Sequence, residues 1–379
     1  MVRGMRVVVA PDKFKGSLTA DEAAAAIEAG LRRARPDVEL VRVPVADGGD
    51  GTLAVVLSTG TAERVEVRAT GPTGEPVDAA IAITGDTAMV EMAEASGLRR
   101  LPGGVPAPLT ATTYGTGELI SAALDRGVAK LVLGIGGSAT NDGGTGMATA
   151  LGARFLDKEG KQLPPGGAAL MRLAKIEAGA LDPRLREVEV TVACDVDNPL
   201  VGPDGAAAVF GPQKGAKPDD VLLLDSALRR YARALQDDLG LDLVTVPGAG
   251  AAGGLGAGAI AFLGAELKSG IQLVLDLAGF ADAIDGADLV ITGEGSLDAQ
   301  SLRGKAPFGV AQKAGEHGVP VVALAGVIEV PAKELRAAGF EEGHALSSLE
   351  PDVERSKRNA AELLERLAEK VGRAWSSLP

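Results

Sequence analysis

The stretch from Gly134 to Met147, GIGGSATNDGGTGM, constrains the fold of this chain more than any other segment. It follows an apolar run, residues 130–133, that is typical of a buried strand, and it precedes small residues that favour a helix. A glycine-rich turn between a strand and a helix exposes backbone N–H groups beside the positive end of the helix dipole. The turn therefore predicts a phosphate-binding loop, in which Asp142 could hold a metal ion. Ser138, Thr140 and Asn141 add short polar donors to this turn.

Two glycine patterns keep other interpretations open. Residues 134–139 match the relaxed dinucleotide fingerprint G-x-G-x-x-A, with Asp157 at a suitable distance for a ribose contact, and residues 248–253 match G-x-G-x-x-G. Chance matches are expected because 52 of the 379 residues are glycine. An NAD-dependent hydroxy-acid dehydrogenase is therefore the alternative enzyme, and a non-catalytic sensor of nucleotides or sugar acids is a third possibility.

The bulk properties of the chain narrow its class. A length of 379 residues exceeds the usual size of one hydrophobic core and predicts two domains. A net charge of −13 and an aromatic content of 3% argue against nucleic acid and membrane surfaces as partners. The single cysteine, Cys194, excludes an intramolecular disulfide, and we expect a cytoplasmic protein without a cleavable signal or a membrane span. Two histidines argue against a Ser-His-Asp triad, and no Walker A motif occurs.

The pattern of predicted elements changes along the chain. Apolar runs and amphipathic stretches alternate near both ends, as in parallel α/β sheets. Residues 61–93 instead show the two-residue alternation and turn signals of an antiparallel meander. This change in the hydrophobic pattern suggests a second domain.

Five loops that mix carboxylates with glycine follow apolar runs, and parallel α/β sheets bind ligands at the carboxyl ends of their strands. They are residues 12–17, 47–52, 136–144, 195–198 and 293–298. Lys15 suits a substrate carboxylate or a transferred phosphoryl group, although a solvated surface lysine is an equally good interpretation. Asp195 suits a general base or a magnesium ligand, and its alternative role is to cap a turn. Lys214, in a loop with no other charge, is expected to be a solvated surface lysine.

The chain carries eight motifs in a specific order. They are Ala10-Pro11-Asp12, Phe14-Lys15-Gly16-Ser17, Ala46-Asp47-Gly48-Gly49, Gly134 to Met147, Asp195 to Leu200, Phe210 to Ala216, Gly250 to Gly256, and Thr292 to Gly295 with Asp298 and Gln300. Together they resemble the bacterial glycerate kinase family, the type I enzymes. The resemblance covers nearly the whole chain and weakens after about residue 327.

This resemblance implies ATP-dependent phosphorylation of D-glycerate to phosphoglycerate, with 2-phosphoglycerate expected and Mg²⁺ as the metal. Another small sugar-acid kinase is the alternative within the same class. The implied fold is α/β with two domains. A Rossmann-like parallel-sheet lobe, residues 1–65 and 285–379, carries a second α/β domain, residues 66–284, inserted into it, and the active site is expected in the cleft between them. We expect a monomer or a homodimer.

Roles for single residues follow from the resemblance together with the chemistry of the loops. Asp195, as the base, and Lys15 are the predicted catalytic residues. Glycerate is assigned to Asp12, Lys15, Ser17, Asp47, Gly48 and Gly49. The nucleotide is assigned to Gly136, Gly137, Ser138, Thr140, Asn141, Gly253, Gly254, Gly293 and Glu294, and the metal to Asp142 and Asp298. Two positions depart from the family pattern: Lys13 replaces the usual serine and could add charge at the anion site, and Asp50 replaces the usual glutamate.

Overall fold

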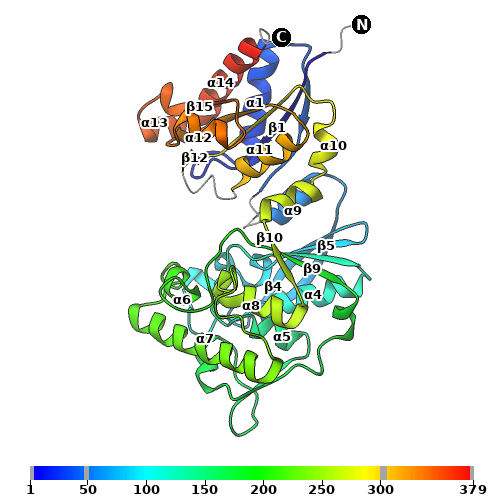
Figure 1. Ribbon diagram of the computed structural model, residues 1–379, viewed down its shortest axis with the longest axis vertical. Helices are drawn as coiled ribbons and strands as arrows, with labels where there is room; N and C mark the ends of the chain where they lie inside the picture. Colours follow the sequence, from blue (N-terminus) through cyan, green and yellow to red (C-terminus); the bar gives the residue numbers. More distant parts are fainter. Residues whose placement is uncertain (1–3, 47–50, 299–304, 376–379) are drawn as a thin grey trace. The chain divides into compact units, whose positions relative to one another are not determined.

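The computed structural model describes residues 4–46, 51–298 and 305–375, and its contacts divide the chain into two compact units (Figure 1). Unit 1 consists of residues 1–47 and 271–379, and unit 2 of residues 48–270. Unit 1 is therefore assembled from both ends of the chain, and unit 2 from its middle. The domain bounds predicted from the sequence, after residue 65 and before residue 285, stay a prediction.

The sheet of unit 1 is parallel throughout. Its strands are β1 (Arg6–Pro11), β2 (Glu39–Arg42), β11 (Leu289–Gly293), β13 (Val321–Ala325) and β15 (Glu342–Ala345). They lie in the order β15-β13-β11-β1-β2, so β1 pairs with both β11 and β2. This is the doubly wound order 2-1-3-4-5, and its topological switch point lies between β1 and β11.

Helices cover both faces of this sheet. Because side chains alternate along a strand, Val7 and Val9 join the hydrophobic cluster that includes helices α1 and α14, whereas Val8 and Ala10 join the cluster that includes α11. Helices α1 and α14 lie side by side (Figure 1), closely enough that a Cβ on Gly30 would lie 2.1 Å from the Glu365 carbonyl oxygen. The helices are α1 (Ala20–Ala34), α9 (Gly270–Leu277), α10 (Phe280–Ile284), α11 (Ala306–Glu316), α12 (Ala332–Ala337), α13 (Val353–Arg358) and α14 (Ala360–Ala374), and a small pair of strands is β12 (Ser296–Leu297) and β14 (Val327–Ile328).

Unit 2 contains a mixed sheet in the order β10-β9-β6-β5-β4-β3. Its strands are β3 (Glu63–Thr70), β4 (Pro76–Thr84), β5 (Thr87–Glu91), β6 (Lys130–Gly134), β9 (Glu189–Ala193) and β10 (Glu266–Lys268). The first three strands form the antiparallel meander that the sequence predicted, and from β5 to β10 all pairs are parallel. The carboxyl ends of β5, β6 and β9 therefore lie at one edge of the sheet.

Two hydrophobic clusters hold unit 2 together. One packs inward-facing residues of β4, β5, β6 and β9 against α4 and α8, and the other surrounds Tyr231 of α7 and includes the edge-to-face pair Phe155–Phe262. The long helix α7 lies along the lower side of Figure 1. The helices are α2 (Thr52–Ser58), α3 (Ala93–Ser96), α4 (Tyr114–Asp125), α5 (Thr145–Ala150), α6 (Ala206–Phe210), α7 (Pro218–Leu239) and α8 (Ala251–Leu263), and a second small pair of strands is β7 (Arg154–Leu156) and β8 (Lys175–Glu177). Among the described helices of both units, none is long and apolar enough to cross a membrane.

Candidate active site

The switch point of the unit 1 sheet carries the first group of predicted site residues. The loops that follow β1 and β11 lie side by side: the Asp12 N–H donates to the Gly293 carbonyl at 2.8 Å, and a Cβ on Gly295 would lie 3.1 Å from the Lys15 nitrogen. A cavity of about 90 Å³ is lined by Lys15, Ser17 and Gly295, with further walls from α13 and the start of α14. Segments almost three hundred residues apart thus meet at this cavity, because β1 and β11 are neighbouring parallel strands.

Two lysines and one carboxylate, that of Glu350, line this cavity. The exposed side chain of Lys15 lines it, and so does Lys357, whose ammonium lies 3.2 Å from the Glu354 carboxylate. The Ser17 hydroxyl donates to the Phe14 carbonyl at 3.0 Å, and its oxygen can also accept. Ammonium groups form charge-assisted hydrogen bonds with carboxylates and phosphates. The cavity therefore has the size and the donors for a small hydroxy acid or a phosphoryl group.

Three acidic residues follow β1 and β11: Asp12 bonds a backbone N–H, whereas Glu294 and Asp298 lie near a lysine. Asp12 is 6% exposed, and its carboxylate accepts from the N–H of the exposed residue Lys13 at 2.7 Å. Glu294 and Asp298 both approach the Lys305 ammonium, at 3.6 and 3.8 Å. Among the described residues no group of three or more His, Cys, Asp and Glu side chains could hold a metal. Mg²⁺, however, needs only one or two protein carboxylates beside phosphate and water oxygens, and Glu294 with Asp298 fits that need.

Three of the predicted substrate residues, Asp47, Gly48 and Gly49, lie outside the described residues. So does Asp50, one of the two positions that depart from the family pattern.

The glycine-rich loop of unit 2 connects β6 to α5, as the sequence predicted, but its polar groups face inward. Asp142 is fully buried, and its carboxylate accepts from the N–H groups of Thr113 (2.8 Å), Gly144 (3.2 Å) and Gly146 (3.2 Å) and from the Thr113 hydroxyl (3.0 Å). Burial raises the pKa of Asp142, and these hydrogen bonds oppose the rise. The carboxylate takes up N–H groups at the start of α5 that an external phosphate would otherwise use. The metal role of Asp142 stays a prediction, and the geometry favours a structural role.

Only the first part of this loop reaches the surface. Ser138, Thr140 and Asn141 are buried, and the Asn141 side-chain amide donates to the Pro108 carbonyl at 3.1 Å. Gly136 is partly exposed and Gly137 is exposed, with a φ of +69° at Gly137. The backbone at these two glycines is therefore the part of the predicted phosphate cradle that a ligand can approach directly.

The predicted nucleotide residues Gly253 and Gly254 lie beneath the same loop. Both are buried and have left-handed backbone angles, with φ of +70° and +89°. A Cβ on Gly253 would lie 2.0 Å from the Thr140 carbonyl oxygen, and a Cβ on Gly254 would lie 3.0 Å from the Gly143 Cα. Because these glycines have no Cβ, α8 can lie close to the loop and support its backbone.

The prediction that Lys214 is a solvated surface lysine is wrong. Its side chain is 1% exposed, and its ammonium donates to the Thr140 carbonyl at 2.6 Å. Burial lowers the pKa of Lys214 to about 7, and the nearby Asp142 carboxylate acts in the opposite direction. Lys214 lies in the short helix η5 (Pro212–Lys214), which holds it under the loop. The sequence of residues 211–215 alone does not indicate this burial.

Asp195 lies two residues after the end of β9, at the sheet edge where the glycine-rich loop follows β6. It is exposed, and one carboxylate oxygen accepts from the Gly270 N–H at 2.9 Å and the Ser269 hydroxyl at 3.1 Å. These bonds join Asp195 to the start of α9, 74 and 75 residues away, and not to its own turn, so the local capping role that the sequence left open stays untested. Its role as a base stays a prediction.

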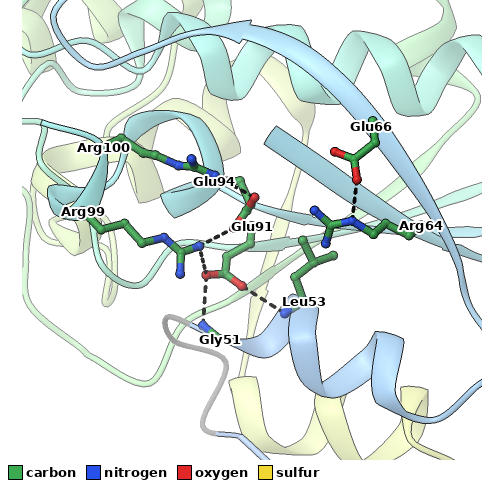
Figure 2. A network of polar contacts seen from close by, with 8 residues as sticks. All are labelled: Gly51, Leu53, Arg64, Glu66, Glu91, Glu94, Arg99 and Arg100. Carbon is green, nitrogen blue, oxygen red and sulfur yellow. Dashed lines mark hydrogen bonds and ion pairs between the residues drawn. The ribbon is translucent and has the colours of Figure 1, made fainter. Parts of the chain in front are cut away.

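Glu91 is a polar residue at the same edge that sequence reasoning missed. It ends β5, has no exposed side-chain surface, and accepts from the backbone N–H groups of Gly51 (3.0 Å) and Leu53 (2.9 Å), as Figure 2 shows. Arg99 approaches the same carboxylate at 3.5 Å and also pairs with Glu94. Glu91 thereby holds the start of α2. The available signal was a glutamate at the end of an otherwise apolar strand.

The comparisons with known proteins agree with these features. The model of the Glycerate kinase family matches residues 7–376. The chain belongs to the glycerate kinase family. It is 48% identical to a glycerate kinase of Bacillus subtilis, with 97% of each chain aligned, and 51% identical to a glycerate 2-kinase of Escherichia coli, with 85% of each chain aligned. A crystal structure described as glycerate kinase 2 from Salmonella typhimurium superposes with a TM-score of 0.85 at 44% identity and covers 99% of both chains.

Three sequence-based predictions are thereby confirmed: the family, the α/β fold class and the phosphotransferase class. The sequence motifs predict a resemblance that weakens after about residue 327, yet the family match continues to residue 376. The dehydrogenase interpretation fails, because its glycine fingerprints belong to a kinase family and residues 253–254 pack against another loop.

Proposed function

We propose that this chain transfers the γ-phosphoryl group of ATP to D-glycerate in the presence of Mg²⁺, with 2-phosphoglycerate as the product. The observation that carries the proposal is the cavity at the unit 1 switch point, where Lys15, Ser17 and Lys357 meet in a member of the glycerate kinase family. The Escherichia coli relative is named a glycerate 2-kinase, and it supports the choice of the 2-hydroxyl.

The predicted residues that a ligand can approach have defined tasks in this proposal. The Lys15 ammonium neutralises the glycerate carboxylate, and the Ser17 hydroxyl accepts or donates a hydrogen bond at the substrate hydroxyls. The N–H groups of Gly136 and Gly137 bind nucleotide phosphate oxygens. Asp195 accepts the proton of the attacking hydroxyl. Asp298 would hold Mg²⁺, and the neighbouring Glu294, which the sequence assigned to the nucleotide, could join it; the ion would neutralise phosphate charge.

The remaining sequence-based expectations belong to the same proposal. Asp12, Asp47, Gly48 and Gly49 complete the glycerate site. We expect a cytoplasmic enzyme that acts as a monomer or homodimer and binds neither nucleic acid nor membranes.

A coupled assay of ADP release tests the activity. ADP should form from MgATP when D-glycerate is added, and L-glycerate and larger sugar acids should support slower turnover. A ³¹P NMR spectrum of the product, compared with authentic 2- and 3-phosphoglycerate, assigns the position. The absence of glycerate-dependent ADP release, together with rapid turnover of another sugar acid, would contradict the proposal.

A further inference from the structure

A second and larger cavity lies wholly within unit 2. Its volume is about 570 Å³, within the range of about 300–1,000 Å³ typical of small-molecule sites. Its walls come from the turn 70–74, the segment 110–114, the first turns of α5, Phe155 of β7 and the segment 162–165. None of the predicted site residues lines it, and the tasks assigned above place no ligand in it.

The walls of this cavity do not favour a charged ligand. Among the described residues that line it there is no Asp, Glu, Lys or Arg, although these residues make up 23% of the chain. Six lining residues are threonines, and Tyr114 and Gln162 add a phenol and an amide. Phe155 and three prolines supply flat apolar surface. The matching ligand is uncharged and flat, with several hydrogen-bonding atoms at its edge, so glycerate and phosphate do not match.

One buried carboxylate joins this cavity to the glycine-rich loop. Asp142, in the loop, accepts from the N–H groups of Thr113 and Gly146, and Thr112 and Gly146 are themselves wall residues. The two walls are in close contact, because a Cβ on Gly146 would lie 2.2 Å from the Thr112 hydroxyl oxygen. The cavity is therefore preformed, and its wall at Thr145 continues directly from the loop predicted to bind phosphate.

From these features we propose that the unit 2 cavity is a nucleoside-binding site. A nucleobase is an uncharged, flat ring with donors and acceptors at its edge, and ribose adds hydroxyl groups that threonine side chains can bind. Which nucleoside binds here rests on the proposed function. The cavity adjoins the loop predicted to bind phosphate, so we identify its ligand as the nucleoside part of the phosphate donor. A free nucleoside that binds as a separate effector has the same chemistry, and the test below distinguishes the two sources.

A matched pair of substitutions tests the site. Thr73 and Thr61 are both exposed. The Thr73 hydroxyl bonds the Glu75 carboxylate at 2.5 Å, and the Thr61 hydroxyl bonds the Thr59 hydroxyl at 2.8 Å. Thr73 lines the cavity and Thr61 does not. Thr73→Trp should fill the cavity and raise the Kd for adenosine, measured by calorimetry on the full chain, at least tenfold. Thr61→Trp should leave that Kd unchanged.

Competition between adenosine and ATP identifies the source of the ligand. If the cavity holds the donor nucleoside, adenosine competes with ATP, and Thr73→Trp raises the KM for ATP but not for glycerate. If a free nucleoside is the ligand, adenosine binds without competing, and only the adenosine Kd changes. Both results support a nucleoside site.

Two results would overturn the inference: wild-type protein that binds no adenosine, or a Thr73→Trp variant with unaltered Kd and KM. Melting temperatures of both variants exclude unfolding as the cause. If Thr73→Trp does not fold, Gln162→Ala, at an exposed part of the wall, should still weaken adenosine binding severalfold. The binding measurement needs no turnover, so a failed glycerate assay refutes the proposed function without deciding this one.

Discussion

Replacing Lys214 with methionine tests the buried arrangement under the glycine-rich loop. Methionine has a similar length and no charge, so the substitution removes the hydrogen bond to the Thr140 carbonyl, 2.6 Å long, without opening a large cavity. Two effects on the free energy of unfolding then oppose each other. The loss of the bond destabilises the variant, and the removal of a buried ionisable group stabilises it.

The size of each effect follows from the structure. An unsatisfied buried carbonyl costs about 1–3 kcal/mol. The pKa of Lys214 falls from 10.5 to about 7. Each pKa unit corresponds to about 1.4 kcal/mol, so at pH 7 this lysine destabilises the folded state by about 5 kcal/mol relative to a group that is uncharged in both states. The penalty shrinks as the pH approaches 10.5, where the unfolded chain also loses its proton.

The sign of the effect of Lys214→Met should therefore change with pH. Between pH 7 and 10.5 the unfolded wild type binds more protons at this position than the folded protein, so wild-type stability rises with pH relative to the variant. The variant should be more stable than the wild type by about 2–4 kcal/mol at pH 7, and less stable by up to about 2 kcal/mol at pH 10. The Asp142 carboxylate, which raises the pKa of Lys214 against the effect of burial, is present in both proteins.

Urea unfolding of both proteins at pH 7, 8, 9 and 10 measures this difference. Lys214→Arg is a suitable control, because guanidinium stays protonated over the whole range and should show no such crossover. A stability difference between wild type and Lys214→Met that is independent of pH would refute the reasoning. It would mean that the lysine is either solvated or fully ionised in the folded protein.

Three further predictions concern the proposed site and its support. Lys15→Ala should lower kcat/KM for glycerate by about tenfold to a hundredfold in steady-state assays, as expected for the loss of one charge-assisted bond of about 1.5–3 kcal/mol; normal kcat/KM would remove Lys15 from the substrate site. Asp195→Asn should reduce kcat by about 10²–10⁴ with an unchanged melting temperature if Asp195 is the base, whereas near-wild-type kcat would leave it only the capping bonds to residues 269–270. Gly253→Ala should destabilise the protein by more than about 1 kcal/mol in urea unfolding, because its φ is +70° and its Cβ would lie 2.0 Å from the Thr140 carbonyl; an unaltered midpoint would contradict the close approach of α8 to the loop.

Much of the fold could be read from local patterns. The capping box of Thr19 and Glu22 marks the start of α1, and the two-residue alternation after residue 61 marks the meander of β3 to β5. The rule that polar loops gather at the carboxyl ends of parallel strands also holds within each unit. It brings Lys15 and Gly295 to one cavity, and it places Glu91 and Asp195 at one edge of the other sheet.

Burial was decided only by the tertiary structure. Asp142 has the same neighbours in sequence whether its carboxylate faces a metal ion or, as here, the N–H groups of Thr113 and Gly146. Lys214 is covered because η5, which carries it, packs against the glycine-rich loop, where the ammonium bonds the Thr140 carbonyl. The unit 2 cavity likewise has walls from segments that the sequence separates by up to a hundred residues.

The sequence by itself determined the family, the strand–helix order and the loops that carry charge, because these follow from local periodicity and from motifs in a set order. The tertiary structure decided which of those charged groups face solvent and which are buried and bond the backbone. The physical reason is that desolvation and hydrogen bonding depend on the segments that cover a side chain, and those segments come from distant parts of the chain.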